Sequence, residues 1–499
     1  MNQSAVGLYA TSLCLLTDLY QLTMAYGYWK SDRADQNAVF HLFFRKNPFQ
    51  GGYVVTAGLA LVLEYLRDFQ FADDDIEYLK TLTGSDDELL FENEFLEYLR
   101  NLKLTVEVDA MPEGTVAFPH QPLLRVKGPI LQCQLLETAL LNIINFQSLI
   151  ATKAARMSLA AGHDAVLEFG LRRAQGIDGG VSASRAAYIG GCAATSNVLA
   201  GKIYGIPVKG THAHSWIMSF DDEITAMESY ADAMPNNCVF LVDTYDTIEG
   251  VKKAITVGKE LRKRGHEMVG IRLDSGDLAY LSLEARRLLD AADFYDAVIV
   301  ASNDLDEHLI ESLRYQGAKI SVWGVGTRLA TAYDQPALGG VYKLAAIEGA
   351  DGEWIPKVKL SEQWIKTSTP GIQQVRRFTN GDGVIADMVF DETLGPSNYM
   401  IDPLDVTRRR EIDSKTAYED LLKPVFKDGG TLTETESLAE IRQRVKTQLS
   451  LFHDGIRRLA NPHRYPVGLE AGLHKLKSCL LYTSPSPRDR TRSRMPSSA

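Results

Sequence analysis

The chain has 499 residues, of which 45% are hydrophobic and 23% are charged, and its formal net charge is −11. It is too long for one ordinary domain, and its composition is that of a soluble globular protein. The acidic balance argues against a nucleic-acid partner, because binding to a phosphate backbone needs a basic face. We expect no membrane partner either, because polar residues interrupt the long apolar runs before they reach about 20 residues.

The amino terminus and the cysteines indicate the compartment. Residues 1–16 lack the basic n-region of a secretory signal, and the five cysteines are not clustered. Such cysteines form neither a disulfide framework nor a zinc pattern. We therefore expect a cytoplasmic protein.

Residues 1–160 mix helical patterns with short strands, and we expect an N-terminal α+β domain. Asp18 and Gln21 form a capping-box pattern at the start of a helix, and Tyr20 falls off the buried stripe of that helix. Tyr20 is therefore either a surface residue or a side chain free to reach a ligand or a partner subunit. Further along, strands are predicted at 39–44, 104–109, 115–117 and 123–126, and a helix at 131–160.

Residues 161–350 alternate strand, turn and helix, which is typical of βα units and a parallel sheet. Seven strands are predicted, at 165–169, 206–208, 239–243, 268–273, 297–301, 319–323 and 341–344, with helices between them such as 183–203, 249–264, 278–291 and 305–315. This pattern predicts an irregular, incomplete parallel α/β barrel, a catalytic domain with its active residues at the carboxyl ends of the strands.

The last third of the chain divides into two parts. Residues 351–483 return to short strands and turns and end in a helix predicted at 436–459, and we expect them to pack back on the N-terminal domain. Residues 484–499 are rich in Ser, Pro and Arg with almost no apolar side chains, which predicts disorder. A basic tail for nucleic acid and a non-native extension are both open for this segment, and we assign it no function.

The most informative motif is the segment 210–215, Gly-Thr-His-Ala-His-Ser, which follows a predicted strand. It places an imidazole nucleophile, His214 with its neighbour His212, beside backbone suited to binding phosphate. Thr211 and Ser215 of the same loop are candidate substrate-binding residues.

A metal site is the rival interpretation of this motif. His-x-His on a barrel strand also begins the metal sites of metal-dependent amidohydrolases, because both imidazoles share one face. Such a site needs further ligands at later strand ends. His266 precedes its strand and His308 lies in a helix, so neither is placed to supply them.

Two other strand ends carry complementary chemistry. Phe169 offers an aromatic face for a flat ring and Arg172 a guanidinium for an anion, although a strand cap with exposed arginines is equally compatible. Arg272, Asp274 and Asp277 stand in one turn, where the carboxylates could accept from sugar hydroxyls or hold a hydrated Mg²⁺. Asp277 could instead only cap the next helix.

The late strands end in residues suited to phosphate. Gly324, Gly326 and Thr327 follow the strand predicted at 319–323, where such barrels often bind phosphate through backbone N–H groups. Ser302 and Asn303 end the strand before it and are further candidates for substrate binding.

Six segments together resemble the nicotinate phosphoribosyltransferase family: 15–29, 169–176, 196–215, 271–278, 322–327 and 338–344. The resemblance runs in order from about residue 9 to about residue 480. It implies an α/β barrel joined to an open β-sandwich-like second domain built from N- and C-terminal segments, and a homodimer with shared active sites. The implied reaction joins nicotinate to 5-phosphoribosyl 1-diphosphate and releases nicotinate mononucleotide and pyrophosphate.

The resemblance also implies that ATP, as a co-substrate, is hydrolysed through a phosphorylated histidine. By motif position His214 corresponds to that histidine, and His212 is its neighbour. Tyr20, offered by the partner subunit, and Phe169 would stack on the pyridine ring. Asp274 would contact the ribose hydroxyls, with Mg²⁺ bound to the substrate diphosphate.

The remaining roles concern the anionic groups and the choice of base. The resemblance implies that Arg272 and Thr211 contact nicotinate and that Thr327, with its flanking glycines, contacts the phosphate. Relatives that use nicotinamide place an aspartate where this chain has Asn197, so a neutral Asn197 favours the acid. Nicotinamide or quinolinate as the base, a metal-dependent barrel hydrolase and a silent binding protein are the alternatives.

Overall fold

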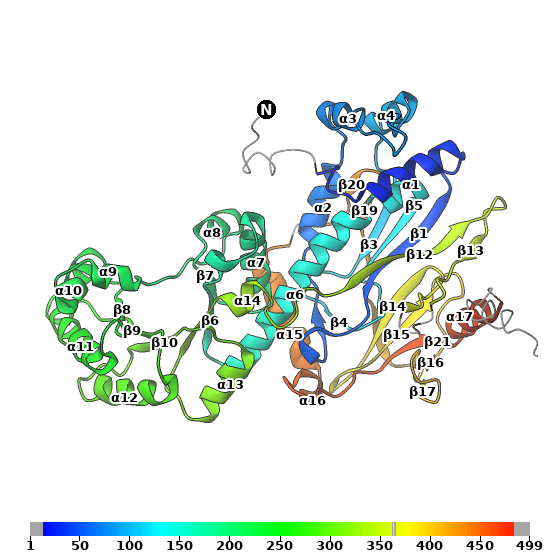
Figure 1. Cartoon of the computed structure of the whole chain (residues 1–499). Coiled ribbons are helices and arrows are strands. Elements are labelled where there is room, and N and C mark those ends of the chain that lie inside the picture. The colour runs from blue at the N-terminus through cyan, green and yellow to red at the C-terminus, as the bar shows by residue number, and fades with distance from the viewer. Residues whose placement is uncertain (1–12, 362, 364–365, 435, 484–499) are drawn as a thin grey trace, which may run out of the picture.

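The computed structural model describes residues 13–361, 363, 366–434 and 436–483. Within them the strands form one parallel sheet, two large sheets that are wholly or mostly antiparallel, and a short hairpin-like pair. The parallel sheet and its helices lie on one side of the long helix α6, and the other sheets lie on the opposite side (Figure 1). None of the helices in these residues has the length and apolar character needed to cross a membrane. The predicted tail 484–499 lies outside the described residues.

The parallel sheet has six strands in the order β7–β6–β11–β10–β9–β8. The strands are β6 (Ala165–Glu168), β7 (Ala194–Thr195), β8 (Val239–Leu241), β9 (Gly270–Leu273), β10 (Val298–Ala301) and β11 (Val322–Val325). The strands are short and mostly apolar, as expected for strands covered on both faces, and β6, β7 and β9 also contain Glu168, Thr195 and Arg272. The predicted strands 165–169, 239–243, 268–273, 297–301 and 319–323 are confirmed, with shifts of up to three residues at their ends.

The helices of this half follow the strands in βα order. They are α7 (Ile177–Ile189), α8 (Val198–Tyr204), α9 (His214–Met218), α10 (Glu223–Ala233), α11 (Thr247–Lys263), α12 (Leu278–Asp290), α13 (Glu307–Tyr315) and α14 (Thr327–Ala330). Asp246, Asp277 and Asp306 each cap the helix that follows a strand, accepting from backbone N–H groups of its first turn. The caps fix where each strand-end loop stops, so the loops between strand and cap are short.

The sheet differs from the predicted barrel because it does not close. The segment predicted as the strand 206–208 makes only one bridge, between Val208 and Thr195. Pro207 lacks a backbone N–H and cannot extend a ladder. Between this segment and the edge strand β8 there is no strand pairing, and one side chain spans the gap: the backbone N–H of Leu241 donates to His212 Nε2 at 3.2 Å.

The helix predicted over 183–203 is also wrong, because two glycines interrupt it. Helix α7 ends at Ile189, and a Cβ on Gly190 would lie 2.2 Å from the carbonyl oxygen of Ala151. Gly191 has φ +125°, a conformation that favours glycine. Gly190 lets α7 lie close against α6, and Gly191 lets the chain turn away from the helix axis toward β7 and α8.

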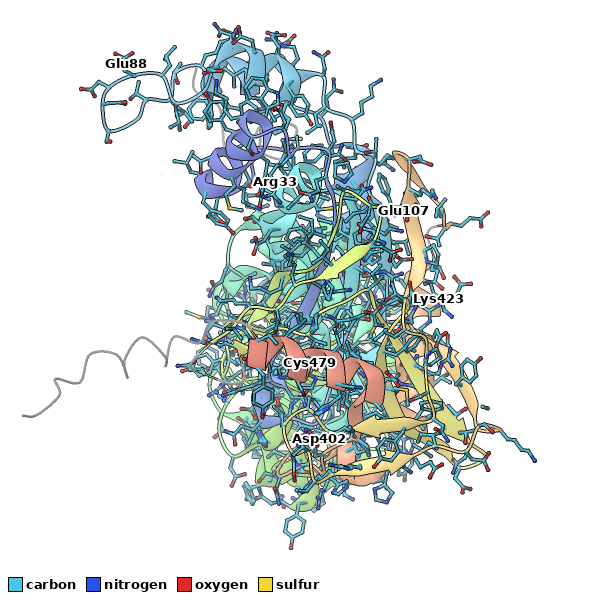
Figure 2. All side chains as sticks on the ribbon, turned by 90° about the vertical axis from the view of Figure 1, so that its right-hand side faces the viewer. Arg33, Glu88, Glu107, Asp402, Lys423 and Cys479 are labelled. Carbon is cyan, nitrogen blue, oxygen red and sulfur yellow. The ribbon has the colours of Figure 1, made fainter. Side chains whose placement is uncertain are left out.

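The predicted strand 341–344 lies in a different sheet, as β12. This seven-stranded sheet has the order β13–β12–β1–β5–β3–β19–β20, and all its pairs are antiparallel. Its strands are β1 (Asn37–Phe44), β3 (Glu107–Ala110), β5 (Leu124–Pro129), β12 (Gly340–Glu348), β13 (Trp354–Pro356), β19 (Lys423–Lys427) and β20 (Gly430–Thr431). The early, middle and late parts of the chain thus share one sheet; in Figure 2 the labelled Glu107 and Lys423 lie along the same edge.

A six-stranded sheet from the late part of the chain packs beside it. Its order is β17–β16–β21–β15–β14–β18, and only β15 and β21 pair in parallel. Its strands are β14 (Gln373–Asn380), β15 (Gly383–Asp391), β16 (Tyr399–Ile401), β17 (Arg409–Glu411), β18 (Ala417–Asp420) and β21 (Val467–Glu470). The backbone N–H of Gln373 donates to His41 Nε2 of β1 at 3.3 Å, and Arg125 of β5 donates to the Gln373 carbonyl at 3.1 Å. These hydrogen bonds join the late sheet to strands from the early part of the chain.

The remaining helices cover these sheets. They are α1 (Leu19–Lys30), α2 (Leu59–Arg67), α3 (Asp73–Leu79), α4 (Asn93–Arg100), α5 (Ile130–Leu135), α6 (Glu137–Ala161), α15 (Leu438–Leu451), α16 (Asp454–Arg457) and α17 (Ala471–Thr483), with the short pair β2 (Val54–Val55) and β4 (Val116–Ala117). The predicted helix 131–160 is confirmed with a break at Leu136, and the predicted helix 436–459 is divided into α15 and α16.

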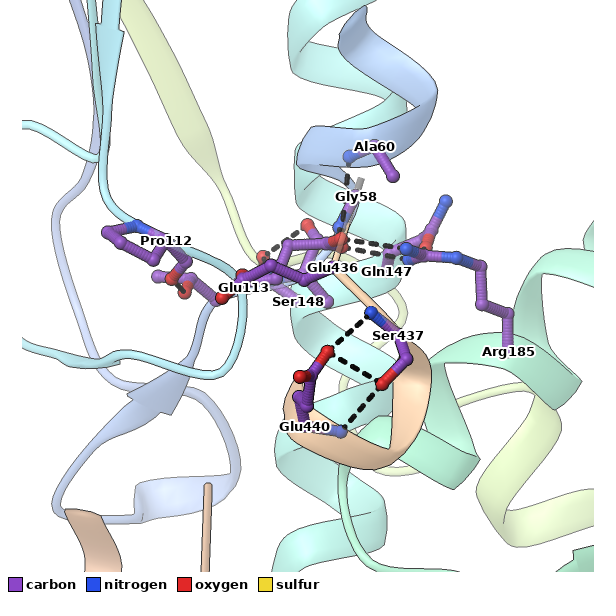
Figure 3. Close-up of polar contacts among 12 residues, drawn as sticks. Gly58, Ala60, Pro112, Glu113, Gln147, Ser148, Arg185, Glu436, Ser437 and Glu440 are labelled. Carbon is purple, nitrogen blue, oxygen red and sulfur yellow. Dashed lines mark hydrogen bonds and ion pairs between the residues drawn. The ribbon is translucent and has the colours of Figure 1, made fainter. Parts of the chain in front are cut away.

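Buried ion pairs tie the two halves together. Glu113 accepts from Arg185 of α7 at 2.7 Å and from the backbone N–H of Gly58 (Figure 3). Burial raises the pKa of Glu113, but Arg185 outweighs it and holds the pKa below the usual value. On the other face of α6, Glu307 of α13 pairs with Lys153 and Arg156, each at 2.7 Å. Buried ion pairs therefore join α7 to the loop at Glu113 and α13 to α6. The division of the chain at residues 160 and 350 stays a prediction.

Candidate active site

Arg272 lies at the centre of a group of strand-end side chains. Its Nε donates to Ser302 Oγ at 2.9 Å, its Nη1 to Thr211 Oγ1 at 2.9 Å, and its Nη2 to Asp274 Oδ1 at 2.8 Å. These contacts hold the guanidinium plane fixed between β9, β10 and the loop before α9. One N–H on each terminal nitrogen remains for a ligand. The structure therefore brings together four predicted residues from three separate segments of the sequence.

Asp274 is held as a carboxylate. Burial raises its pKa, but the Ser302 hydroxyl and the Arg272 guanidinium outweigh burial and hold the pKa below the usual value. The Ser302 hydroxyl donates to the same carboxylate oxygen that Arg272 contacts. A group of this kind stays negatively charged at neutral pH and can stabilise positive charge that develops nearby.

Asp243, just after β8, is a residue that the sequence prediction missed. Its Oδ2 accepts from the backbone N–H of Asp274 at 2.8 Å and from Ser275 Oγ at 2.7 Å. Its Oδ1 is buried and has no hydrogen-bond partner in the described part of the chain. The signal was present, because Asp243 follows a strand in the segment LVDTYD, but no role was assigned to it. An unpartnered carboxylate oxygen beside Asp274 is suited to a cation or to a ligand hydroxyl.

His214 and His212 face different surroundings. His214 begins α9 and is half-exposed; its Nδ1 lies 3.1 Å from Thr244 Oγ1 and its Nε2 lies 3.5 Å from Asp274 Oδ2. His212 is buried, its Nε2 accepts from Leu241, and burial lowers its pKa. His214 is thus the imidazole that reaches the site, and His212 is a structural neighbour. The two rings do not form the paired face that a His-x-His metal site needs.

Phe169, Gly324 and Gly326 form the adjoining strand-end wall. The Phe169 ring lies against Gly324, where an added Cβ would stand 2.9 Å from the ring, and an added Cβ on Gly326 would stand 3.4 Å from the Phe169 carbonyl. Thr327 follows at the start of α14, and its hydroxyl lies 3.5 Å from Arg173 Nη1. Arg172 is exposed beside it. Only glycine fits at position 324 against the Phe169 ring, whereas a Cβ at position 326 would be in ordinary contact with the backbone.

The end of β10 has unusual backbone geometry. Asn303 has φ +103° and Asp304 has φ +42°, both outside the range that most residues adopt. Such conformations cluster at binding and catalytic sites, because surrounding structure must hold them. Asn303 is exposed at the same end of the sheet as Ser302, and its role as a site residue stays a prediction.

Asn197 belongs to a buried hydrogen-bond network. Its side chain accepts from the backbone N–H of Ala200, capping α8, and its amide nitrogen lies 3.2 Å from Ser184 Oγ. Ser184 and Thr195 donate to Glu168 Oε2 at 2.8 and 2.6 Å, and the backbone N–H of Gly170 donates to Glu168 Oε1. The amide of Asn197 is thus occupied within the chain, and its predicted effect on the choice of base stays a prediction. Glu168, which the sequence prediction missed, is the acceptor at the centre of this network.

Two predicted residues lie apart from the strand-end group. Ser215 is exposed on α9 beside His214. Tyr20 is exposed on α1, on the other side of α6 from the strand ends (Figure 1). Burial and the neighbouring Glu137 carboxylate, which accepts a hydrogen bond from it, raise the pKa of Tyr20 to about 12. Within one chain the structure does not bring Tyr20 to the site.

A cluster of cations near Tyr20 was also missed by the sequence prediction. We call Arg45, His120, Lys343 and Lys477 the cation cluster. Arg45 Nε and His120 Nε2 are buried without hydrogen-bond partners among the described residues. Burial and then the charges of Lys477, Arg45 and Arg464 lower the pKa of His120 to about 4, and burial lowers that of Lys477 to about 8. Lys343 lies 3.8 Å from Glu137, the partner of Tyr20. At neutral pH His120 is neutral and Lys343 faces Glu137, so Arg45 and Lys477 are the two members without a carboxylate partner among the described residues. Cations without a counter-charge are suited to a bound anion.

A metal centre made only of protein ligands is not present in the described residues, because they contain no group of three or more His, Cys, Asp or Glu side chains placed to bind one. Asp243, Asp274 and Ser302 instead present oxygen atoms in one place, which suits a hydrated Mg²⁺ that arrives with its substrate.

The fold and the strand-end group define the class of protein: an α/β enzyme with an anion-binding site at the carboxyl ends of parallel strands. Three models of the nicotinate phosphoribosyltransferase family match this chain: the N-terminal domain at residues 15–145, the family model at 165–380 and the C-terminal domain at 372–477. The chain belongs to the nicotinate phosphoribosyltransferase family.

Individual relatives agree with this assignment. The chain is 46% identical to the nicotinate phosphoribosyltransferase of Bacillus subtilis over 468 residues, which cover 92% of this chain and 93% of the relative. It is 36% identical to the human enzyme of that name, over 93% of this chain and 96% of the relative. The crystal structure of human nicotinic acid phosphoribosyltransferase superposes with a TM-score of 0.81 at 34% identity, covering 93% of this chain and 99% of that chain.

Proposed function

We propose that this chain joins nicotinate to 5-phosphoribosyl 1-diphosphate, forms nicotinate mononucleotide and pyrophosphate, and couples ATP hydrolysis through a phosphorylated His214. The observation that carries the proposal is the Arg272 group, a fixed guanidinium beside Asp274, whose pKa is held below its usual value. A guanidinium fork matches the nicotinate carboxylate, and a carboxylate matches the ribose. Small molecules are therefore the partners of this site, and the free cysteines of the described residues are compatible with work in the reducing cytoplasm.

The transfer depends on positioning and charge. Arg272 and Thr211 hold the nicotinate carboxylate, and Phe169 stacks on the pyridine ring, so the ring nitrogen is aimed at the ribose carbon. Departure of pyrophosphate leaves positive charge on that carbon, which Asp274 stabilises from the ribose side. The backbone N–H groups around Gly324, Gly326 and Thr327 bind the 5-phosphate, with Ser302 and Asn303 at the adjoining strand end.

His214 is placed to couple ATP hydrolysis to this reaction. It stands at the mouth of the site, half-exposed, and Thr244 and Asp274 orient its ring. A neutral imidazole nitrogen attacks the γ-phosphorus of ATP, the bond to the bridging oxygen of the β-phosphate breaks, ADP leaves, and His214 carries the phosphoryl group. A doubly charged phosphate beside Asp274 would then repel that carboxylate, so phosphorylation would shift the loop that begins at Asp274, directly after the end of β9, the strand that contains Arg272. Water later cleaves the N–P bond and releases phosphate, which completes the hydrolysis of ATP.

Mg²⁺ is proposed as a substrate-bound ion. When bound, it neutralises the diphosphate and improves it as a leaving group. The buried, unpartnered Oδ1 of Asp243 and the carboxylate of Asp274 are the protein oxygens that would face it. Their other hydrogen bonds hold both carboxylates in place, so the chain supplies fixed charge and the substrate supplies the ion.

A second copy of the chain would complete the site. Tyr20 and the cation cluster lie on the opposite side of α6 from the strand ends, and Glu137 links Tyr20 to Lys343. The aromatic side chain of Tyr20 matches the flat ring of the substrates, and the cations Arg45 and Lys477 match their phosphates. We therefore place this face of one subunit over the strand ends of the other in a homodimer.

The test is consumption of 5-phosphoribosyl 1-diphosphate by the purified chain with nicotinate, nicotinamide or quinolinate, each with and without ATP. The proposal predicts that kcat/KM is highest for nicotinate and that ATP stimulates the reaction. A preference for nicotinamide or quinolinate would assign the chain to another base, and no consumption with any base would contradict the proposal.

A further inference from the structure

A cavity far from the strand ends is lined by arginines. It has a volume of about 540 Å³ and lies between the hairpin of β16 and β17 and the segment that leads into β21. In Figure 2 the labelled Asp402 marks this part of the molecule, below the C-terminal helix α17. Five arginine residues contribute to its lining, Arg408, Arg409, Arg410, Arg458 and Arg464. Its lining shares no residue with the strand-end group or with the cation cluster.

Three of these arginines are held in place without being neutralised. Arg409 Nε donates to the Val406 carbonyl at 3.0 Å, and Arg410 Nη1 donates to the Ile385 carbonyl at 2.8 Å. Arg458 Nε donates to the Gly455 carbonyl at 3.4 Å. Among the described residues no carboxylate forms an ion pair with any of the three. Carbonyl oxygens orient a guanidinium but leave its charge for another partner.

Carboxylates compensate only the other two arginines. Arg464 pairs with Asp402, the single acidic residue in the lining, at 3.0 Å, and Arg408 pairs with Asp405 at 3.1 Å. The chain as a whole carries a net charge of −11, so a cavity with five arginines and one carboxylate is a local exception. Like charges repel each other when no counter-charge is present, and a bound anion removes that repulsion.

The positive charge of the lining also lowers the pKa values of two nearby histidines. Burial and then the charges of Lys477 and Arg409 lower the pKa of His474 on α17. Arg464 is among the cations that lower the pKa of His120, after burial, Lys477 and Arg45. The charge of the lining therefore extends beyond its own ion pairs. It adds to the geometric argument that the cavity lacks an anion.

We infer that this cavity binds a polyphosphate chain, as a site additional to the active site. Guanidinium forks match phosphate oxygens in pairs, and three unneutralised forks around one cavity match several linked phosphates. The volume lies within the usual range for small-molecule sites, about 300–1,000 Å³. Inorganic polyphosphate and the triphosphate of a nucleotide share this chemistry. The inference does not depend on the reaction proposed above.

Hydrogen–deuterium exchange of the full chain tests the site where it lies. The probes are inorganic tripolyphosphate, ATP and, as a control without phosphate, adenosine. Tripolyphosphate should slow amide exchange in residues 399–411 and 458–467, and adenosine should not. Equal protection by ATP identifies the phosphate chain alone as the ligand, and stronger protection by ATP identifies a nucleoside triphosphate; both support the site.

Two variants with the same loss of charge separate the cavity from a general effect. The test variant is Arg409→Gln/Arg410→Gln/Arg458→Gln. The control is Arg262→Gln/Arg264→Gln/Arg287→Gln, whose arginines are exposed and already paired with Glu267, Asp232 and Glu284. The dissociation constant for tripolyphosphate is measured from the slowing of amide exchange in residues 399–411 and 458–467. It should be at least about tenfold higher in the test variant than in the wild-type chain, and within about twofold of the wild-type value in the control. No protection in the wild-type chain, unchanged protection in the test variant, or equal loss in both variants would overturn the inference.

Discussion

At the scale of single residues, the contacts that each side chain already makes decide whether it can meet a substrate. His212 and His214 are two residues apart, yet one is buried with its Nε2 occupied by a backbone N–H and the other reaches Asp274 and Thr244. Sequence could identify the motif and rank His214 above His212 only through a family resemblance. The contacts that separate them come from β8, about 30 residues further along the chain.

His214→Ala should abolish the stimulation of turnover by ATP and leave a slow, ATP-independent reaction, because Arg272, Thr211 and Phe169 remain to bind nicotinate. Incubation of the wild-type chain with ATP labelled in the γ-phosphate should give acid-labile protein phosphate, absent from the variant. Labelling that persists in His214→Ala would remove the histidine from its proposed role.

Glu168→Gln tests the buried hydrogen-bond network of Glu168, which precedes Phe169, the residue proposed to stack on the nicotinate ring. Glu168 accepts from the hydroxyls of Ser184 and Thr195 and from the backbone N–H of Gly170. Glutamine replaces one carboxylate oxygen with an NH₂ group, which would face an N–H or O–H donor of this network instead of accepting from it. A buried donor without an acceptor costs about 1–3 kcal/mol. Because Gly170 follows Phe169, we predict that KM for nicotinate rises about tenfold or more while KM for 5-phosphoribosyl 1-diphosphate changes little.

Glu470→Gln is the matched control for that substitution. Glu470 is also buried at a strand end, and it accepts from Ser397 Oγ and from the backbone N–H of Leu473 in the late sheet. It should lower stability without a selective change in KM for nicotinate. If the two variants have the same kinetic profile, Glu168 acts on stability alone.

At the scale of elements, the βα rhythm predicted the parallel strands well and failed at the edge of the sheet. Buried parallel strands are continuous apolar runs bounded by turns, which is why β6 and β8 to β11 could be read from the sequence. The segment 194–195 lies in an Ala-rich run, which predicts a helix, but in the structure it is the strand β7. The helix before it ends at Ile189, where Gly190 packs closely on α6, and this contact is visible only in three dimensions. The strand β12 was placed in the wrong sheet, because its partner β1 is about 300 residues earlier in the chain.

Glu113→Gln tests how the halves are joined at α7. Removal of one partner of a buried ion pair leaves Arg185 charged and unpaired, which costs about 3–5 kcal/mol. Urea unfolding should show a loss of that size. Glu107→Gln, which breaks the partly exposed pair with Lys427, should cost less than about 1 kcal/mol. Equal losses in the two variants would show that the Glu113–Arg185 pair does not hold the halves together.

At the scale of the whole molecule, buried neutral histidines set the dependence of stability on pH. The pKa of His120 is lowered to about 4 and that of His41, through burial and then the charge of Arg125, well below its usual value. In the unfolded chain both take up a proton below about pH 6.5. The unfolded state then binds more protons than the folded state, so stability falls as the pH is lowered.

The predicted loss occurs between about pH 6.5 and about pH 4, and His120 alone contributes on the order of 3 kcal/mol to it. Urea unfolding at a series of pH values measures the effect, and His120→Gln should flatten the curve in this range. Below about pH 4.5 a further loss is expected, because the lowered pKa values of Glu113 and Glu307 contribute stability that disappears when these carboxylates are protonated. A stability that does not change between pH 6.5 and 4 in the wild-type chain would show that His120 is protonated when folded.

The architecture shows why sequence could not place every site residue. Arg272, Asp274, Thr211 and Ser302 follow strands, so a parallel sheet predicted their proximity. Asp243 also follows a strand, but an unpartnered carboxylate oxygen is visible only in three dimensions. Arg45, His120, Lys343 and Lys477 come from distant segments of two antiparallel layers, where no local pattern marks their meeting.

The central claim is that the strand ends of one subunit and the Tyr20 face of another make one active site, and mixing two inactive variants tests it most directly. Tyr20→Ala and Arg272→Ala homodimers should each be nearly inactive. After equal mixing and verified subunit exchange, half of the dimers are hybrids in which one of the two sites is intact. The account predicts recovery of about a quarter of the wild-type activity. No recovery despite complete exchange would show that each active site is made by a single chain.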